Sequence, residues 1–201
     1  NLEIQTNVIR AAHQHDTKKL LFLGSTCVYP REAPQPMPES ALLTGPLEPT
    51  NEPYSIAKIA GIKLCQAYAK EHGRPFISVM PTNMYGPNDN FDPKHSHVGA
   101  GLLLKFHHAK LTGAPSVTLW GSGKPRRELL YVDDCADACL FLMETYSSPE
   151  IVNIGTGEDV TVAELGEIVK KVTGYDGTIA YDASKPDGMP RKLVDVTKIR
   201  G

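Results

Sequence analysis

A tyrosine and a lysine four residues apart are the first residues of this chain that suggest chemistry. They stand in the segment Tyr54-Ser55-Ile56-Ala57-Lys58. On a helix, side chains at positions i and i+4 lie on the same face. A neighbouring ammonium favours the phenolate form of a phenol, so such a pair can pass a proton to or from a substrate oxygen. Pairs with this spacing also occur by chance on exposed helices, so the spacing alone does not establish a site.

Ser25 supplies a hydroxyl group shortly before that helix. The apolar run from Lys18 to Leu23 ends in Gly24-Ser25-Thr26, which is typical of a buried parallel strand with a functional loop at its carboxyl end. Seven of the 16 prolines follow between Pro30 and Pro53. Prolines at this density exclude a regular helix, and long ordered loops of this kind are often functional.

Strands and helices are expected to alternate along the rest of the chain. The apolar spacing predicts a helix over residues 7–15 and a second helix over 54–72, which Gly73 ends. Further helices are expected from about 98 to 110, from 133 to 146 and over 161–173, the last opened by a capping box at Thr161 and Glu164. Strands are expected at 76–80, 116–120, 151–154 and 178–181. This alternation predicts an α/β fold with a mostly parallel sheet.

Composition narrows the class of protein. The 201 residues carry a formal net charge of −2 and are 41% hydrophobic, which is typical of a globular protein and argues against nucleic acid as the main partner. No apolar run is long enough to cross a membrane. The four cysteines lack zinc or thioredoxin spacing, so we expect no metal, a reducing environment and a cytoplasmic location. Cys135 and Cys139, one helical turn apart, fit a buried helix face.

Short segments along the chain resemble the GDP-L-fucose synthases. The order of strand with serine, loop, Tyr-x-x-x-Lys helix and strand is that of short-chain dehydrogenase/reductases, and residues 128–134 resemble the extended, sugar-nucleotide branch of that family. More specific segments extend the resemblance from near Asn7 to the end. They are Asn51-Glu52-Pro53-Tyr54, Pro81-Thr82-Asn83, Asp89-Asn90-Phe91, Ser96-His97-Val98, Leu119-Trp120-Gly121-Ser122-Gly123 and Ser184-Lys185-Pro186-Asp187-Gly188.

The resemblance implies conversion of GDP-4-keto-6-deoxy-D-mannose to GDP-L-fucose with NADPH, by two epimerisations and one reduction. Ser25 and Tyr54 would hold the 4-keto oxygen, Tyr54 would donate its proton, and Lys58 would bind the nicotinamide ribose and tune Tyr54. Cys27 would be the base of the epimerisations and His97 the acid. Inversion beside a ketone needs a base on one face and an acid on the other. Taken alone, Cys27 also fits a buried strand-end thiol, and His97 a loop histidine.

The resemblance also implies binding sites for NADP and for the GDP-sugar. The residues that would line the cofactor are Leu23, Gly24, Ser25, Thr26, Lys58, Pro81, Thr82, Asn83, Met84 and His97. Those that would bind the substrate are Asn83, Lys105, Trp120, Arg127 and Lys192, with the cations facing the diphosphate. Lys105 stands where the family pattern has arginine, and so keeps the charge but loses bidentate geometry. Taken alone, Lys105 and Lys192 also fit solvated surface charges.

The expected fold is a Rossmann-like doubly wound parallel sheet, with its N-terminal strands missing, and a small C-terminal substrate-binding lobe. Residues 1–95 would be the remaining part of the dinucleotide-binding domain, and residues 96–201 would contribute the substrate-binding lobe and late Rossmann elements. The Gly-rich turn that holds a pyrophosphate is not in this sequence, nor is the helix expected after Arg200. We therefore expect a fragment that binds the cofactor weakly alone. A homodimer, through the helices near Asn7 and Tyr54, is expected by resemblance.

Two alternatives stay open at this point. One is another extended-branch enzyme, a UDP-sugar 4-epimerase or a sugar-nucleotide dehydratase, against which Cys27 and His97 count. The other is a truncated relative without catalysis that serves as a structural subunit. The intact Ser25, Cys27, Tyr54 and Lys58 count against this second alternative.

Overall fold

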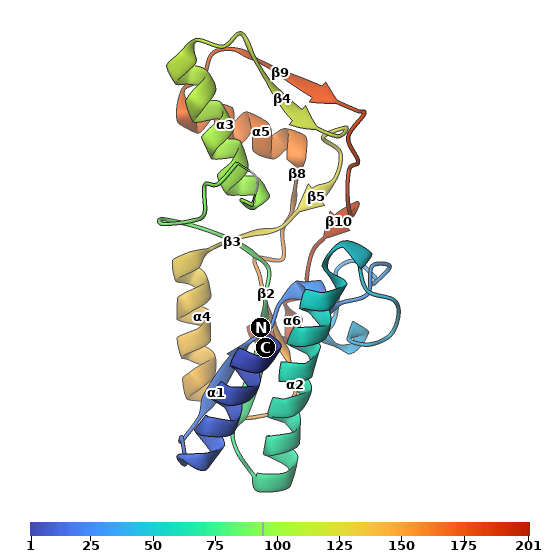
Figure 1. Cartoon of the computed structure of the whole chain (residues 1–201), viewed down its shortest axis with the longest axis vertical. Helices are drawn as coiled ribbons and strands as arrows, with labels where there is room; N and C mark the ends of the chain where they lie inside the picture. Colours follow the sequence, from blue (N-terminus) through green and yellow to red (C-terminus); the bar gives the residue numbers. More distant parts are fainter. Residues whose placement is uncertain (94) are drawn as a thin grey trace.

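A three-stranded parallel sheet forms the lower half of the computed structural model, which describes residues 1–93 and 95–201 (Figure 1). Its order is β1-β2-β7, with β1 spanning Leu20–Leu23, β2 Phe76–Pro81 and β7 Val152–Ile154. All six residues of the central strand β2 are buried. A strand buried on both faces is what a parallel sheet covered by helices requires, so the predicted α/β class is confirmed.

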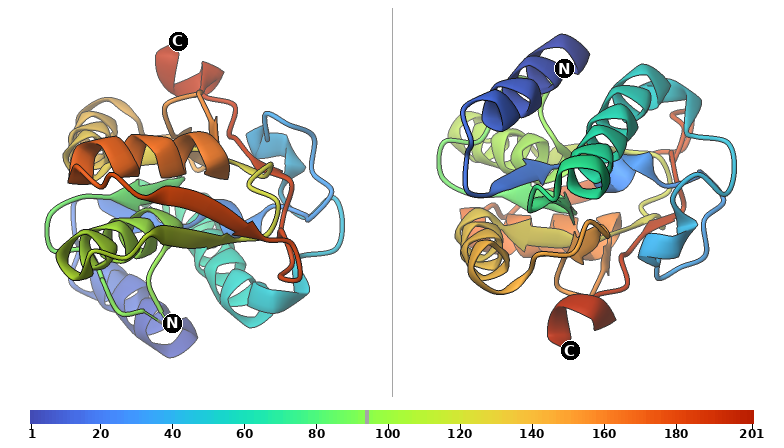
Figure 2. Two further views of the ribbon diagram at one scale, coloured as in Figure 1. Left: turned by 90° about the horizontal axis from the view of Figure 1, so that it is seen from above. Right: turned by 90° about the horizontal axis from the view of Figure 1, so that it is seen from below.

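Helices cover both faces of this sheet (Figure 2). On one face α1 (Leu2–Gln14) packs beside α2 (Glu52–His72), and on the other lies α4 (Val132–Thr145). Successive residues of β2 serve the two cores in turn: Phe76 and Met80 join one cluster, whereas Ile77 and Val79 join the other. This alternation follows from the period of two along a strand.

The boundaries of the predicted helices follow local signals. Gly73 adopts a left-handed φ of 63° directly after α2, as predicted. The first helix begins at Leu2, not at residue 7 as predicted. The apolar pattern did not reveal its first turn, because Leu2 and Ile4 face outward and do not add to the apolar face of the helix. The buried Gln5 side chain explains the extension, since it donates a hydrogen bond to the Ala57 carbonyl of α2.

A second lobe lies at the top of Figure 1. There β4 (Ser116–Trp120) pairs in parallel with β9 (Thr178–Asp182), and α3 (Val98–Thr112) packs beside α5 (Val162–Thr173). Their core contains Phe106, Leu119, Leu165 and Val169. The predicted capping box is present, with reciprocal hydrogen bonds between Thr161 and Glu164. The division of the chain near residue 95 stays a prediction.

Short strands that the sequence did not predict join the two lobes. One pair is β3 (Asn83–Tyr85) with β6 (Leu129–Tyr131), and a small sheet has the order β10-β5-β8. In that sheet β10 is Arg191–Lys192, β5 is Arg126–Arg127 and β8 is Val160–Thr161. Strands of two or three residues are too short to show a period. A last short helix, α6, spans Thr197–Arg200.

The proline-rich segment forms an ordered loop against the lower lobe. Between residues 30 and 51 it contains two 3₁₀ turns, η2 (Glu39–Ala41) and η3 (Pro49–Asn51), and no α-helix, as predicted. Met37 is buried, and its amide donates a 2.8 Å hydrogen bond to the Leu193 carbonyl. The loop therefore anchors the returning chain that carries β10. Within the described ranges, no helix combines the length and apolar composition needed to cross a bilayer.

Candidate active site

A cavity of about 630 Å³ opens at the carboxyl ends of β1 and β2. In open α/β sheets, ligands bind at this edge. Residues from five separate parts of the chain line it: the loop after β1, the start of α2, the segment after β2, the start of α3 and the start of α4. They are Gly24, Ser25, Thr26, Cys27, Asn51, Tyr54, Pro81, Thr82, Asn83, Met84, Tyr85, Gly86, Pro87, Asn88, Asp89, His97 and Val132. The structure therefore brings together most of the residues that the sequence singled out.

The loop after β1 is fixed by hydrogen bonds to its own turn and to α2. Ser25 caps the 3₁₀ turn η1 (Thr26–Val28), and its Oγ accepts a 3.2 Å hydrogen bond from the Cys27 amide. The Ser55 hydroxyl, at the start of α2, donates a 2.8 Å hydrogen bond to the Cys27 carbonyl. The Ser25 hydroxyl and the Cys27 thiol therefore have fixed positions beside Tyr54.

Tyr54 and Lys58 lie on one face of α2, as their spacing predicts. The Lys58 ammonium is 5.8 Å from the centre of the Tyr54 ring and donates a 2.7 Å hydrogen bond to the Leu23 carbonyl. Burial lowers the pKa of Lys58. Tyr54 lines the cavity, whereas Lys58 and Leu23 lie behind that lining. Lys58 thus joins α2 to the end of β1.

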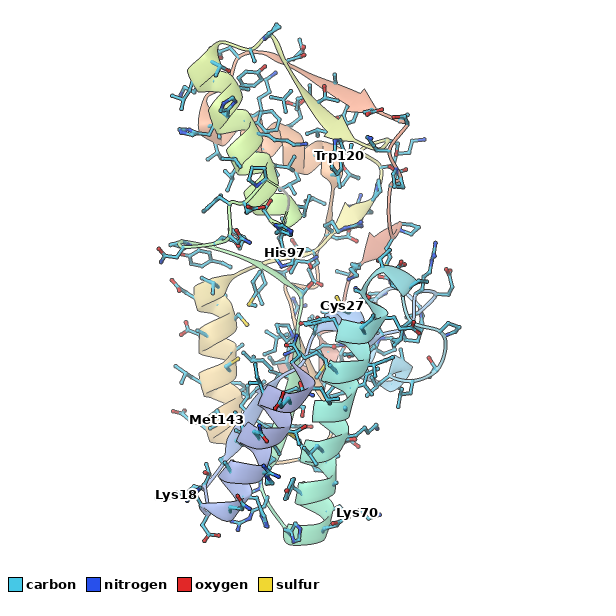
Figure 3. All side chains as sticks on the ribbon, viewed as in Figure 1. Lys18, Cys27, Lys70, His97, Trp120 and Met143 are labelled. Carbon is cyan, nitrogen blue, oxygen red and sulfur yellow. The ribbon has the colours of Figure 1, made fainter. Side chains whose placement is uncertain are left out.

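The opposite wall comes from the end of β2 and from α3. Thr82 is buried, and its amide donates a 3.0 Å hydrogen bond to the Ile154 carbonyl of β7. His97 is the residue that precedes the first turn of α3. Figure 3 places His97 between the two lobes, above Cys27. The Cys27 thiol and the His97 imidazole therefore come from different elements, and both residues line one cavity.

A smaller cavity of about 250 Å³ adjoins the first, because Asn51, Asn83 and His97 line both. Its other lining residues are Glu48, Thr50, Val98, Arg127, Met189 and Lys192. Arg127 Nη1 donates hydrogen bonds to the carbonyls of Arg126 (2.8 Å) and Met189 (2.7 Å), and burial lowers the pKa of Arg127. Four of the predicted substrate-binding residues do not line the main cavity. Two of them, Arg127 and Lys192, line this smaller cavity together.

Lys192 makes a contact that the sequence did not predict. Its Nζ donates a hydrogen bond to Cys27 Sγ at 3.3 Å. The two residues are 165 positions apart in the sequence, and the tertiary contacts of β10 with β5 and with the proline-rich loop bring them together. No local pattern could have revealed this contact.

Lys105 and Trp120 lie on the upper lobe, outside both cavities. Figure 3 shows Trp120 well above His97 and Cys27. The Trp120 side chain is 67% exposed, with the ammonium groups of Lys105 and Lys185 at 5.1 and 5.9 Å from the ring centre. The structure does not join these residues to the cavities, so their role in substrate binding stays a prediction.

Sequence reasoning gave no role to several lining residues. In the main cavity these are Asn51, Tyr85, Asn88, Asp89 and Val132, and in the smaller one Glu48, Thr50 and Met189. Asn51 and Asp89 stand in segments that carry the family resemblance, so a signal for them existed. Val132 gave none, because an apolar residue at the start of a helix suggests packing. Among the described residues, no cluster of His, Cys, Asp or Glu could hold a metal ion.

The chain is similar in sequence and in fold to proteins of known family. The chain is 62% identical over 199 residues to GDP-L-fucose synthase 1 of Arabidopsis thaliana, covering 99% of this chain and 62% of that protein. It is 56% identical over 208 residues to GDP-L-fucose synthase of Escherichia coli K12, covering 99% and 65%. A solved GDP-L-fucose synthetase from Naegleria fowleri bound to NADP superposes with a TM-score of 0.93 at 31% identity, covering 98% and 63%.

The chain thus spans about three fifths of the length of the curated relatives it matches. Residues 1–155 match the model of the NAD dependent epimerase/dehydratase family. That match covers more than half of the chain, including the whole of the parallel sheet and the loop with Ser25 and Cys27. On these grounds, the chain belongs to the NAD dependent epimerase/dehydratase family.

Proposed function

We propose that this chain carries the reacting side chains of an enzyme that converts GDP-4-keto-6-deoxy-D-mannose to GDP-L-fucose with NADPH. The observation that carries the proposal is one cavity lined by Ser25, Cys27, Tyr54 and His97. A reductase of this branch needs only the serine and the tyrosine. A thiol and an imidazole in the same cavity add the base and the acid that two epimerisations require. Relatives named GDP-L-fucose synthase, at 56–62% identity, support this choice.

The main cavity fits the nicotinamide end of a dinucleotide. Its donor set of Ser25 and Thr26 hydroxyls and the Asn83 amide suits ribose and carboxamide groups, and Lys58 supplies a cation behind it. Gly24 has no side chain, so the end of β1 can lie close to β2. Pro81, Thr82 and Met84 also line the cavity. NADPH, when bound, supplies a hydride to the keto carbon. NADP is therefore the proposed cofactor. Leu23 acts indirectly, because its carbonyl accepts the hydrogen bond that holds the Lys58 ammonium.

Cys27 and His97 carry out the proposed epimerisations at the carbons beside the ketone. The Cys27 thiolate takes the proton from the carbon, so an S–H bond forms, the C–H bond breaks, and the electron pair moves to the ketone oxygen. His97 then delivers a proton to the opposite face of the carbon, and the ketone is restored with inverted configuration. This division of labour requires both groups in one cavity, and the lining of the main cavity by Cys27 and His97 supports it.

Tyr54 and Ser25 carry out the proposed proton transfer of the reduction. Both hydroxyls donate hydrogen bonds to the 4-keto oxygen, and Tyr54 gives its proton to the oxygen as the carbon is reduced. Lys58, 5.8 Å from the Tyr54 ring centre, stabilises the phenolate that remains. Asn83 and Arg127, which line the smaller cavity, are proposed to bind the sugar and its diphosphate. Lys105 and Trp120 are proposed to bind the nucleotide.

The proposed enzyme is a cytoplasmic homodimer. All four cysteines are free thiols, which fits a reducing compartment. Helices α1 and α2 pack side by side and leave apolar side chains exposed, namely Leu2, Ile4, Val8 and Ile56. A second copy of the same helices would cover these side chains, and an interface of this kind is isologous.

The experiment that tests the proposal measures both deuterium incorporation and formation of the reduced product. In D₂O, a full-length protein that contains this chain, with NADPH and GDP-4-keto-6-deoxy-D-mannose, should yield GDP-L-fucose with deuterium at both epimerised carbons. Cys27→Ser should abolish deuterium uptake, with a loss of about 10²-fold or more, and still reduce the unepimerised ketone. Tyr54→Phe should take up deuterium but form no reduced product. Turnover of UDP-sugars with none of GDP-sugars would contradict the proposal, and unchanged GDP-L-fucose formation by Cys27→Ser would exclude Cys27 as the base.

A further inference from the structure

We propose that Lys192 is the positioning residue of Cys27, whose sulfur it holds in place at the cavity wall. The inference rests on the proposed function, in which Cys27 is the base of the epimerisations. The contact itself is the Lys192 Nζ to Cys27 Sγ hydrogen bond of 3.3 Å. An ammonium beside a thiol favours the thiolate, which is the form that can take up a proton.

The backbone of Lys192 is fixed on both sides. In the parallel pair β5–β10, Lys192 lies opposite Arg127, and the Glu128 amide donates a 3.2 Å hydrogen bond to the Lys192 carbonyl. The next residue, Leu193, is buried, and its amide donates to Gln35 Oε1 at 3.0 Å. Lys192 therefore reaches Cys27 from a rigid strand.

Cys27 is held equally firmly. Its amide donates to Ser25 Oγ and its carbonyl accepts from Ser55, so neither end of the turn can swing away. Two groups on rigid elements form a preorganised pair, since little freedom is lost when they interact. The contact therefore belongs to the built site and does not depend on a flexible surface side chain.

The charge of Lys192 is available to Cys27. Among the described residues, Lys192 has no carboxylate within the 4.0 Å of an ion pair, whereas its strand neighbour Arg191 is paired with Asp159. Glu48 lines the same small cavity, but its carboxylate lies 3.7 Å from Arg31. The other ionisable groups on the walls are Tyr54, Tyr85, Asp89, His97 and Arg127. The Lys192 ammonium is the cation that contacts the Cys27 sulfur.

The ammonium keeps its proton throughout the reaction. It acts through Cys27, whose sulfur gains the proton from carbon and so loses its negative charge in the step. Lys192 therefore differs from a diphosphate ligand, which would act on substrate affinity. The experiment therefore compares the reactivity of Cys27 with the affinity for the substrate.

Alkylation of Cys27 by iodoacetamide, followed peptide by peptide with mass spectrometry at pH 6–9, tests the contact directly. Lys192→Met should slow alkylation of Cys27 at pH 7 by about tenfold, because the removal of one adjacent cation disfavours the thiolate. Lys192→Arg should restore most of the rate. Cys139, on α4, should react equally in all variants and so reports on folding. Lys18→Met, at the lower end of the molecule in Figure 3 and away from Cys27, is the matched control for loss of one charge.

Deuterium uptake and substrate affinity complete the test. Lys192→Met should lower deuterium uptake at the epimerised carbons as much as it lowers alkylation, with KM for the GDP-sugar unchanged. A raised KM with unchanged Cys27 alkylation would overturn the proposal and make Lys192 a diphosphate ligand. If wild type converts no GDP-sugar but Lys192→Met still slows alkylation, the proposed function fails, and the coupling of Lys192 to Cys27 is supported.

Discussion

Gly24 shows how a single residue shapes the site without carrying any chemistry. A Cβ atom at this position would lie 2.3 Å from Met80 Cε and 2.9 Å from the Val79 carbonyl oxygen. The methionine end can move, but the carbonyl oxygen belongs to the central strand β2 and accepts the Gly24 amide at 2.8 Å. Only glycine lets the strand end lie this close to β2, and this closeness sets where Ser25 begins its turn.

Gly24→Ala should therefore lower both stability and activity. We expect a loss of about 1–3 kcal/mol in the free energy of unfolding, as for overpacking in a core, and a shift of Ser25 that reduces turnover. Urea denaturation followed by circular dichroism measures the first effect. Gly99→Ala is the matched control: nothing lies within 4 Å of its added Cβ, which stands in the first turn of α3. Equal destabilisation of the two variants would contradict the crowding argument.

The candidate site could be predicted from the sequence where chemistry and local spacing coincide. Tyr54 and Lys58 share a helix face, and Ser25 and Cys27 share one turn, so their proximity follows from short segments. The contact of Lys192 with Cys27 could not be predicted, because it depends on a strand pairing far along the chain. Resemblance alone suggested Lys192 as a diphosphate ligand, and the structure places it against the thiol.

At the level of secondary structure, the predicted elements are those with a strong period or a strong end signal. Helix α2 combines an apolar face with Gly73, and α5 has a capping box, so both were found nearly residue for residue. The small sheet β10-β5-β8 has only two residues a strand. Its stability comes from side chains that hold separate segments together, which no single segment can reveal.

Asp159 is the side chain that joins this small sheet. Its carboxylate is 4% exposed and lies 2.7 Å from Arg126 Nε and 2.5 Å from Arg191 Nε, one arginine on each of the paired strands β5 and β10. Burial raises the pKa of Asp159, but the hydrogen bonds from Arg191 and Arg126 outweigh burial and hold it below its usual value. The stabilising contribution is thus present above the unfolded pKa and is lost as the pH falls through the lower, folded pKa.

Asp159→Asn should therefore destabilise the protein at neutral pH by about 1–2 kcal/mol, less than for a fully buried ion pair, because the two arginine side chains are 38% and 39% exposed to solvent. The difference from wild type should shrink as the pH falls below the unfolded pKa of an aspartate, near 4. Urea unfolding at a series of pH values measures both effects. Asp137→Asn, an exposed carboxylate on α4, should change little. If Asp159→Asn lowered the free energy of unfolding by the same amount at every pH, including pH values below the unfolded pKa of an aspartate, the effect would not depend on ionisation of Asp159.

On the scale of the whole molecule, exposed apolar side chains form one group on the helices of each face of the parallel sheet. Leu2, Ile4 and Val8 face outward from α1, beside Ile56 of α2. Helix α4, on the other face of the sheet, also exposes Leu140 and Phe141. A homodimer through α1 and α2 predicts that only the first group lies in the interface between two copies.

Ile4→Glu should therefore dissociate the dimer. Ile4 is 70% exposed in the single chain, and a buried charge without a partner should raise the dissociation constant by about 100-fold or more, which is roughly 3 kcal/mol. Size-exclusion chromatography with light scattering should show a dimer for the wild type and a monomer for the variant at micromolar concentration. Leu140→Glu, at a side chain 63% exposed on α4, should stay dimeric. If Leu140→Glu dissociates instead, α4 forms the interface, and a monomeric wild type would mean that neither helix pair associates.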